Sequence, residues 1–257
     1  MSQKSLAPLI YVVAGASRGI GLALVEVIAA KDSTAIIYAG ARNPSSASEL
    51  AQLAAQHPGR IVIVKYISGE KEGNDTIAKE IGDKHGRVDT LIANAGVNTW
   101  FGQVHEMPIK DFEDHFAVNA LGPAVLFQSF RDLLKASSFP RFVPISSMVG
   151  SLELVTKRPA DATPYSVSKA ALNWITRKIH FENEWLVAFP QCPGAVYTDM
   201  AKGVIAADKT GMFEQMMKDR WRSPDAAANM LIDIIQASTR EKDGGQFHTI
   251  EGKRHPW

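Results

Sequence analysis

The chain contains very little cysteine. Cys192 is the one cysteine among 257 residues, so no disulfide can form within the chain, as is usual in a reducing compartment. One thiol cannot complete a zinc site, and the seven histidines include no pair at the spacing of metal ligands. We therefore predict a cytoplasmic protein without a bound metal.

Net charge and long apolar runs are also nearly absent. The formal net charge is +1, so no broad electrostatic field favours nucleic acid or an anionic membrane surface as a partner. No apolar run approaches the ~18 residues of a membrane span, and the first residues lack the basic and apolar regions of a signal peptide. We expect neither a nucleic-acid nor a membrane partner, and we interpret the basic ending EGKRHPW as a solvated end.

The sequence is rich in short apolar runs that alternate with longer helical stretches. Runs such as LIYVVAG and TAIIYAGA precede stretches such as GIGLALVEVIAAKD, which is typical of a parallel sheet covered on both faces. We predict an α/β fold with a single Rossmann domain over residues 1–257. Its sheet is expected to be doubly wound, mostly parallel and seven-stranded, with helices on both faces and GQFHTI as the last strand. The segments 151–162 and 199–222 follow strand ends and should border a ligand, the second as a substrate lid.

A glycine-rich loop separates the first predicted strand from the first predicted helix. Its glycines let the backbone turn tightly and approach a pyrophosphate at the helix N-terminus. The spacing G-x-x-x-G-x-G differs from the common G-x-G-x-x-G, and an ordinary strand-to-helix turn is the alternative. The predicted dinucleotide-binding residues of this loop are Gly15, Ser17, Arg18, Gly19, Ile20 and Gly21.

The end of the second predicted strand bears on the choice of cofactor. An acidic residue there would bind the ribose hydroxyls of NAD and repel a 2′-phosphate. The chain instead has Arg42, followed by Ser45 and Ser46, with Arg18 in the glycine loop. Two guanidiniums and two hydroxyls suit a phosphate dianion, although two surface arginines are the alternative. We predict NADP(H) in preference to NAD(H).

Tyr165 and Lys169 stand four residues apart in TPYSVSKAALNW, a stretch of helical composition. Positions i and i+4 share one face of a helix, so the phenol and the ammonium can serve one site. Two side chains that merely cover the same patch of surface are the alternative.

Six segments, in order, resemble the short-chain dehydrogenase/reductase superfamily across nearly the whole chain. They are GASRGIG, NAG at 94–96, VNALGP, ISSMVG, YSVSK and PGAVYTDM. The ending is further similar to carbonyl reductases of the sniffer type and to fungal ketoreductases of the norsolorinic acid ketoreductase kind. The resemblance implies a catalytic tetrad of Asn119, Ser147, Tyr165 and Lys169. It also implies a homodimer through the helices of Asn119 and Tyr165, although the insertion before the tyrosine leaves a monomer open.

The chemistry of carbonyl reduction fits that tetrad, because a hydride and a proton must both reach the carbonyl group. A phenol titrates at about 10, and Lys169 with the nicotinamide cation is expected to lower that pKa. Ser147 would stabilise the developing charge; we choose it over Ser146 because the family's serine precedes x-x-G. Pro123 has no N–H, so the Asn119 carbonyl is expected to hold a water that leads to Lys169.

The resemblance also implies further cofactor contacts. Asn94 and Gly96 lie in the segment that passes beneath the adenosine, and Thr198 holds the nicotinamide carboxamide beside the Val196 backbone. Beyond the glycine loop, the predicted cofactor residues are Arg42, argued above from its position, and Asn94, Ala95, Gly96, Tyr165, Lys169, Pro193, Gly194, Val196 and Thr198. Tyr66 departs from the family pattern, in which an aspartate at this position often contacts adenine.

An apolar, methionine-rich wall is predicted for the substrate, because such residues follow the strand ends. The predicted pocket residues are Trp100, Met148, Tyr197, Met200, Met212 and Phe213. Met212 and Met216 alternatively pack a lid helix. We predict an NADPH-dependent oxidoreductase that reduces a bulky hydrophobic ketone or aldehyde. The alternatives are an NADP(H)-binding regulatory or scaffold protein without turnover, and an alcohol dehydrogenase that works in the oxidative direction.

Overall fold

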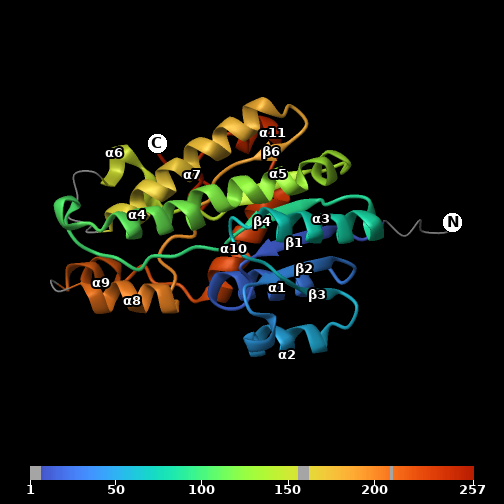
Figure 1. Cartoon of the computed structure of the whole chain (residues 1–257), viewed down its shortest axis with the longest axis horizontal. Helices are drawn as coiled ribbons and strands as arrows, with labels where there is room; N and C mark the ends of the chain where they lie inside the picture. The colour runs from blue at the N-terminus through green and yellow to red at the C-terminus, as the bar shows by residue number, and fades with distance from the viewer. Residues whose placement is uncertain (1–6, 156–161, 209–210) are drawn as a thin grey trace.

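The computed structural model describes residues 7–155, 162–208 and 211–257, apart from the side chains of Val155, Met212, Phe213 and Met216. Its centre is a parallel six-stranded sheet in the order β3-β2-β1-β4-β5-β6 (Figure 1). The strands are β1 (Ile10–Ala14), β2 (Ile36–Ala41), β3 (Ile61–Lys65), β4 (Thr90–Ala93), β5 (Arg141–Pro144) and β6 (Val187–Ala188). This order confirms the predicted Rossmann fold.

Helices cover both faces of the sheet, and none in the described part is both long and apolar enough to cross a membrane. The helices are α1 (Gly19–Lys31), α2 (Ser48–Gln56), α3 (Lys71–His85), α4 (Ile109–Phe116), α5 (Gly122–Lys135), α6 (Leu152–Val155), α7 (Thr163–Glu182), α8 (Asp199–Ala207), α9 (Met212–Met217), α10 (Pro224–Ala237) and α11 (Arg240–Asp243). Short 3-10 turns are η1 (Pro44–Ser46), η2 (Val104–Glu106) and η4 (Met148–Gly150), whereas η3 (Ala117–Leu121) is π-helical.

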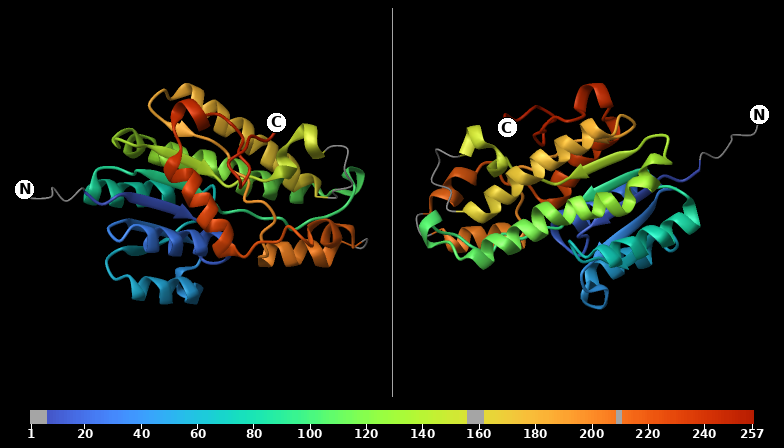
Figure 2. Two further views of the ribbon diagram at one scale, coloured as in Figure 1. Left: turned by 180° about the vertical axis from the view of Figure 1, so that it is seen from behind. Right: turned by 45° about the horizontal axis from the view of Figure 1, so that its top comes forward.

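The alternation of side chains along β1 produces two apolar cores. Val12 packs into the core that contains α3 and α5, whereas Val13 packs into the core that contains α1 and α10. Figure 2 shows α10 crossing the sheet beside α1 on the face that is hidden in Figure 1. Because both faces are buried, the strands need the continuous apolar runs that the sequence contains.

The prediction of a seventh strand is wrong, because the sheet formed by the described residues has six strands. In the run GQFHTI, His248 forms only isolated bridges, parallel to Gln191 and antiparallel to Arg254. The chain turns back immediately afterwards, and the Thr249 N–H donates to the Lys253 carbonyl at 2.7 Å. A run that reverses within a few residues cannot form a ladder of strand length.

The ending EGKRHPW is solvated only in part: Glu251, Lys253 and Arg254 are exposed, whereas Gly252, His255, Pro256 and Trp257 are half-buried. Residues 247–257 form a structure that we call the C-terminal hairpin, in which the His255 N–H donates to the Phe247 carbonyl at 2.7 Å. Phe247 and Ile250 are buried, and the Cys192 N–H donates to the His248 carbonyl at 2.8 Å. The hairpin therefore continues the sheet edge beyond β6.

Candidate active site

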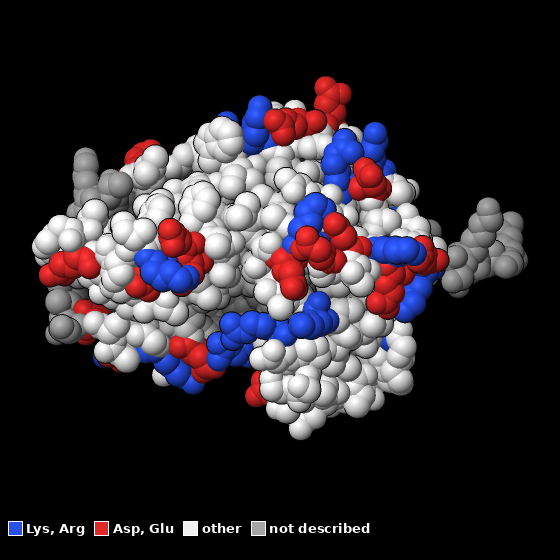
Figure 3. All heavy atoms as spheres, in the orientation of Figure 1, with Lys and Arg blue, Asp and Glu red and all other residues white. Residues whose placement is uncertain are grey.

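A cleft of about 1970 Å³ opens at the carboxyl ends of the strands, where β1 and β4 lie side by side and the strand order reverses. The predicted residues that line it are Gly15, Ser17, Arg18, Gly19, Ile20, Arg42, Asn94, Ala95, Gly96, Ser147, Met148, Tyr165, Lys169, Pro193, Gly194, Val196, Thr198 and Met200. Lys and Arg side chains flank a hollow on the face seen in Figure 3. In the described part of the chain, no cluster of His, Cys, Asp and Glu could hold a metal ion.

The glycine loop lies against the end of β4 too closely for side chains. Gly15 has a φ of +84°, and an ideal Cβ there would lie 2.7 Å from the Ala95 backbone. Gly21 does not line the cleft, but a Cβ on it would lie 2.0 Å from the Gly15 carbonyl oxygen. That oxygen accepts a hydrogen bond of 2.8 Å from Asn94 Nδ2. The loop therefore leaves bare backbone beside the N-terminus of α1, the geometry that accommodates a pyrophosphate.

Two arginines stand at the end of the cleft near β2. Arg42 follows Ala41, the last residue of β2, and the structure shows no hydrogen bond or ion pair from its guanidinium to any residue that it describes. Arg18 is largely exposed, and its Nη1 lies 3.4 Å from Asp199 Oδ2 across the cleft. Exposed pairs of this kind contribute little to stability, so both guanidiniums can turn toward a bound anion.

Tyr165 and Lys169 project from one face of α7 into the cleft. Lys169 Nζ lies 5.5 Å from the centre of the Tyr165 ring and donates to the Ile145 carbonyl at 2.8 Å. Burial lowers the pKa of Lys169 to about 8. Burial also raises the pKa of Tyr165, and the hydrogen bond to Ser147 offsets only part of that rise. Desolvation therefore favours the protonated phenol at this position. The lowering expected from Lys169 together with the nicotinamide cation stays a prediction.

The two serines that follow β5 have different partners. Ser146 is buried, and its hydroxyl donates to Asn173 Oδ1 at 2.6 Å. Ser147 caps η4, where its Oγ accepts from the Val149 N–H at 3.4 Å, and its hydroxyl is hydrogen-bonded to Tyr165. Both serines line the cleft, but only Ser147 is bonded to the phenol, because the Ser146 hydroxyl is bonded to Asn173.

Asn119 lies beneath the cleft instead of lining it. It belongs to the π-helical turn η3, which immediately precedes α5 and its Pro123. A π-helical turn accommodates a missing donor of this kind by widening the helix. The Asn119 Oδ1 accepts from the Val97 N–H at 2.8 Å, and its Nδ2 donates to Ser168 Oγ at 3.0 Å. An ideal Cβ on Gly96 would lie 3.2 Å from Asn119 Oδ1 and 3.7 Å from Lys169 Nζ, so two of the tetrad residues approach this glycine.

The predicted substrate residues are only partly brought together. Met148 and Met200 line the cleft, and the side chains of Met212 and Phe213 lie outside the described part of the structure. Trp100 and Tyr197 do not line the cleft. The Trp100 ring lies over the Gly102 backbone, and Tyr197 packs edge-on against Trp221 with ring centres 5.7 Å apart.

The sequence analysis missed one wall of the cleft, which the C-terminal hairpin supplies through Thr249, Ile250, Glu251 and His255. No motif marks these residues, and only the packing of the hairpin beside β6 brings them to the site. The basic composition of EGKRHPW concealed this role, because solvated ends have the same composition.

Comparison with known proteins identifies the family. The model of the short chain dehydrogenase family matches residues 9–209. Norsolorinic acid ketoreductase of Aspergillus parasiticus is 33% identical to the chain over 258 residues, which cover 96% of this chain and 91% of the relative. Norsolorinic acid ketoreductase stcE of Emericella nidulans is 34% identical over 254 residues, which cover 96% of this chain and 93% of that relative.

Solved structures show the same fold. An NADPH-bound carbonyl reductase from chicken fatty liver superposes with a TM-score of 0.84 at 27% identity, covering 98% of this chain and 100% of the other. The carbonyl reductase Sniffer of D. melanogaster, at 20% identity, has a TM-score of 0.83 over 98% and 100% of the two chains. The chain is therefore a member of the short-chain dehydrogenase/reductase family of nicotinamide-dependent oxidoreductases.

Proposed function

We propose that the protein reduces a ketone or aldehyde to an alcohol with NADPH. The observation that carries this proposal is the group formed by Tyr165, Ser147 and Lys169, in which two hydrogen-bonded hydroxyls and a buried ammonium meet on one wall of the cleft. The names of the ketoreductases and of the chicken carbonyl reductase support a carbonyl substrate and NADPH.

The residues present fit the proposed cofactor. The bare glycine backbone at Gly15 and Gly19 forms the cradle that a Cβ would fill, and it would hold the pyrophosphate. Arg42 and Arg18 would bind the 2′-phosphate, since no acidic residue ends β2. The loop that contains Pro193, Gly194, Val196 and Thr198 would hold the nicotinamide end.

The proposed mechanism assigns one task to each tetrad residue. When bound, NADPH supplies the hydride that reduces the carbonyl carbon. Tyr165 Oη donates its proton to the carbonyl oxygen, and the Ser147 hydroxyl hydrogen-bonds to that oxygen as negative charge develops. Lys169 stabilises the phenolate that remains, and it binds the ribose of the cofactor. Asn119 holds the Val97 backbone and Ser168 in place beneath them.

The substrate side of the cleft favours a hydrophobic carbonyl compound. Met148 and Met200 line it, together with Phe101 and Val204, and polarizable methionines adapt to bulky ligands. The segment 199–222, which contains α8 and α9, would serve as a lid over this side within a single domain. The oxidative alternative is disfavoured by the arginines, because cellular NADPH normally drives reduction.

The direct test is a panel of ketones and aldehydes assayed by the loss of NADPH absorbance and, separately, of NADH absorbance. We expect carbonyl-dependent oxidation that is faster with NADPH. Tight NADPH binding without turnover on any carbonyl would instead support the regulatory or scaffold function.

Replacing Arg42 by Asp should shift the cofactor preference toward NADH. The substitution removes a charge-assisted hydrogen bond to the 2′-phosphate and places a like charge beside it. We expect the ratio of kcat/KM for NADPH to that for NADH to fall roughly 10- to 100-fold, because a charge-assisted bond contributes about 1.5–3 kcal/mol. Arg131→Asp on α5, away from the cleft lining, is the matched control. An unchanged ratio in Arg42→Asp would remove Arg42 from the phosphate site.

NADPH binding should weaken at alkaline pH. Burial gives Lys169 a pKa of about 8 in the cofactor-free protein, so its ammonium form is lost as pH rises above that value. If only the ammonium binds the ribose, the Kd for NADPH should rise about tenfold per pH unit between pH 8 and 10. Isothermal titration calorimetry measures this slope. The Lys169→Met variant should bind NADPH more weakly, and its Kd should change much less with pH. A steep rise of the Kd with pH in that variant would assign the effect to another group.

A further inference from the structure

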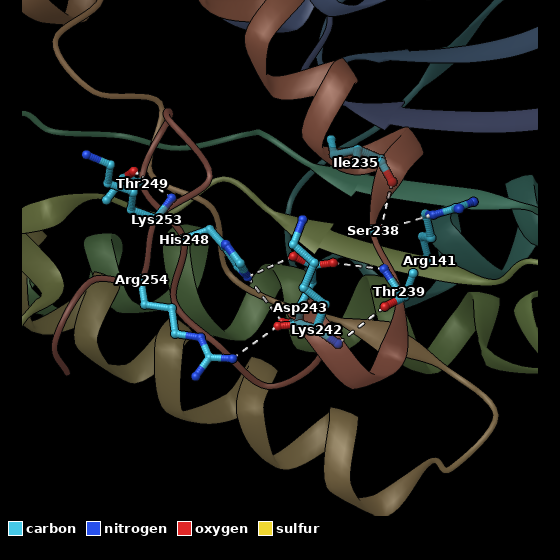
Figure 4. Close-up of polar contacts among 10 residues, drawn as sticks. All are labelled: Arg141, Ile235, Ser238, Thr239, Lys242, Asp243, His248, Thr249, Lys253 and Arg254. Atoms are coloured by element: carbon cyan, nitrogen blue, oxygen red, sulfur yellow. Dashed lines mark hydrogen bonds and ion pairs between the residues drawn. The ribbon is translucent and has the colours of Figure 1, made fainter.

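The C-terminal hairpin is fixed to α11 by polar contacts, of which the contact between His248 and Asp243 is buried (Figure 4). Asp243, at the end of α11, is 2% exposed, and its Oδ2 accepts from the Thr239 N–H at 2.8 Å. His248 Nε2 lies 3.5 Å from Asp243 Oδ1, and Arg254 Nη2 donates to the Lys242 carbonyl at 3.3 Å. The hairpin is therefore a rigid support, as a residue that selects a substrate requires.

The hairpin lies at the catalytic end of the cleft. Its His248 carbonyl accepts from the Cys192 N–H, and Cys192 lines the cleft. Burial is the main cause of the raised pKa of Cys192. The charge of Glu251 raises this pKa further, whereas the charge of Lys169 opposes the rise. Cys192, Lys169 and Glu251 all line the cleft, and the bond between Cys192 and His248 joins the hairpin wall to the end of the cleft that contains the tetrad.

Most polar groups on this wall are already engaged. Thr249 Oγ1 accepts from the N–H groups of Glu251 at 3.1 Å and Lys253 at 3.2 Å. The Glu251 carboxylate pairs with Arg222 at 2.9 Å. His255 differs: its ring packs on Phe247 with centres 4.8 Å apart, and its main-chain N–H is bonded, but its imidazole nitrogens make no hydrogen bond to any described residue.

The imidazole of His255 is suited to bind a neutral polar group. Burial lowers its pKa, and the charge of Glu251 only partly counteracts this effect. At neutral pH the ring is therefore uncharged, with one N–H donor and one acceptor nitrogen. Phe247 holds the ring from behind, so little side-chain entropy remains to be lost when a ligand binds.

We propose that His255 determines substrate specificity by hydrogen bonding to a second polar group of the carbonyl substrate, such as a ring hydroxyl or a second carbonyl. This inference rests on the proposed carbonyl reduction and extends it to a substrate class. The apolar residues select size and hydrophobicity, and a neutral polar group without a partner selects a substituent, because a substrate that lacks the substituent leaves the imidazole unpaired.

The test compares aryl ketones in matched pairs, namely acetophenone and its ortho-, meta- and para-hydroxy derivatives. We expect the wild-type protein to have a higher kcat/KM for at least one hydroxylated ketone than for the parent. In His255→Leu this preference should fall about 3- to 10-fold, the effect of one neutral hydrogen bond. His255→Gln keeps a donor and an acceptor and should retain part of the preference. The Kd for NADPH should be unchanged in both variants.

Two results would overturn the role of His255: a wild-type protein that does not distinguish the pairs, or a preference that His255→Leu retains in full. His57→Leu, at the end of α2 and away from the cleft lining, is the control for a general effect of losing a histidine. Failure of the proposed function is recognised separately, because no ketone of any kind would then be reduced.

Discussion

Replacing Tyr165 by Phe should lower the kcat for NADPH-dependent carbonyl reduction by about 10²- to 10⁴-fold, the usual contribution of a positioned proton donor. The substitution removes only the hydroxyl that Ser147 hydrogen-bonds and leaves the ring beside Lys169. Because Lys169 keeps its bond to the Ile145 carbonyl, the shape of the cofactor site should be preserved. Steady-state loss of NADPH absorbance measures the rate, and calorimetric titration measures the Kd for NADPH.

The control for this experiment is Tyr197→Phe, which removes a phenol that is half exposed and does not line the cleft. That variant should reduce ketones at the wild-type rate. If Tyr165→Phe retained wild-type turnover, the proton would have to come from another group or from water, and the assignment of the tetrad would be wrong. If its rate fell only because NADPH no longer bound, Tyr165 would be a binding residue.

The local motifs predicted the parts of the structure that depend on short stretches of sequence. Gly15 and Gly19 adopt positive φ, as a tight strand-to-helix turn requires. Tyr165 and Lys169 share a helix face because helical geometry fixes the i, i+4 relation. The doubly wound sheet followed from the alternation of apolar runs with helical stretches, and the place of the cleft followed from the rule that ligands lie beyond the carboxyl ends of parallel strands.

Features that arise from packing between distant segments escaped the sequence analysis. His248 looked like part of a strand, but whether a short run extends a sheet or turns back depends on its neighbours. Met148 reached the cleft and Trp100 did not, although both follow strand ends, because loop conformation decides which way a side chain turns. The π-helical turn at Asn119 was visible only as a missing donor at Pro123, which does not specify how the helix adapts.

Replacing Gly21 by Ala should destabilise the protein and weaken NADPH binding. An ideal Cβ at this position would lie 2.0 Å from the Gly15 carbonyl oxygen and 2.6 Å from Asn94 Nδ2. The loop would have to move away from α1. This movement would separate Asn94 Nδ2 from the Gly15 carbonyl oxygen and distort the backbone cradle. We expect a loss of about 1–3 kcal/mol in the free energy of unfolding, the usual cost of overpacking, measured by urea denaturation.

Gly203→Ala in α8 isolates the cause of that loss. Gly203 also lies within a helix, but a Cβ there meets no atom of the described residues within 4 Å. Alanine stabilises a helix relative to glycine by up to about 1 kcal/mol, so Gly203→Ala should stabilise the protein slightly. Helix propensity alone predicts the same sign at Gly21. Changes of opposite sign in the free energy of unfolding of the two variants would therefore show that the close approach of the backbone to Gly21, and not its helical conformation, requires glycine.

Equal urea midpoints and equal NADPH affinity for Gly21→Ala and the wild type would show that the loop has room for a side chain, and that the cradle is not defined by this contact.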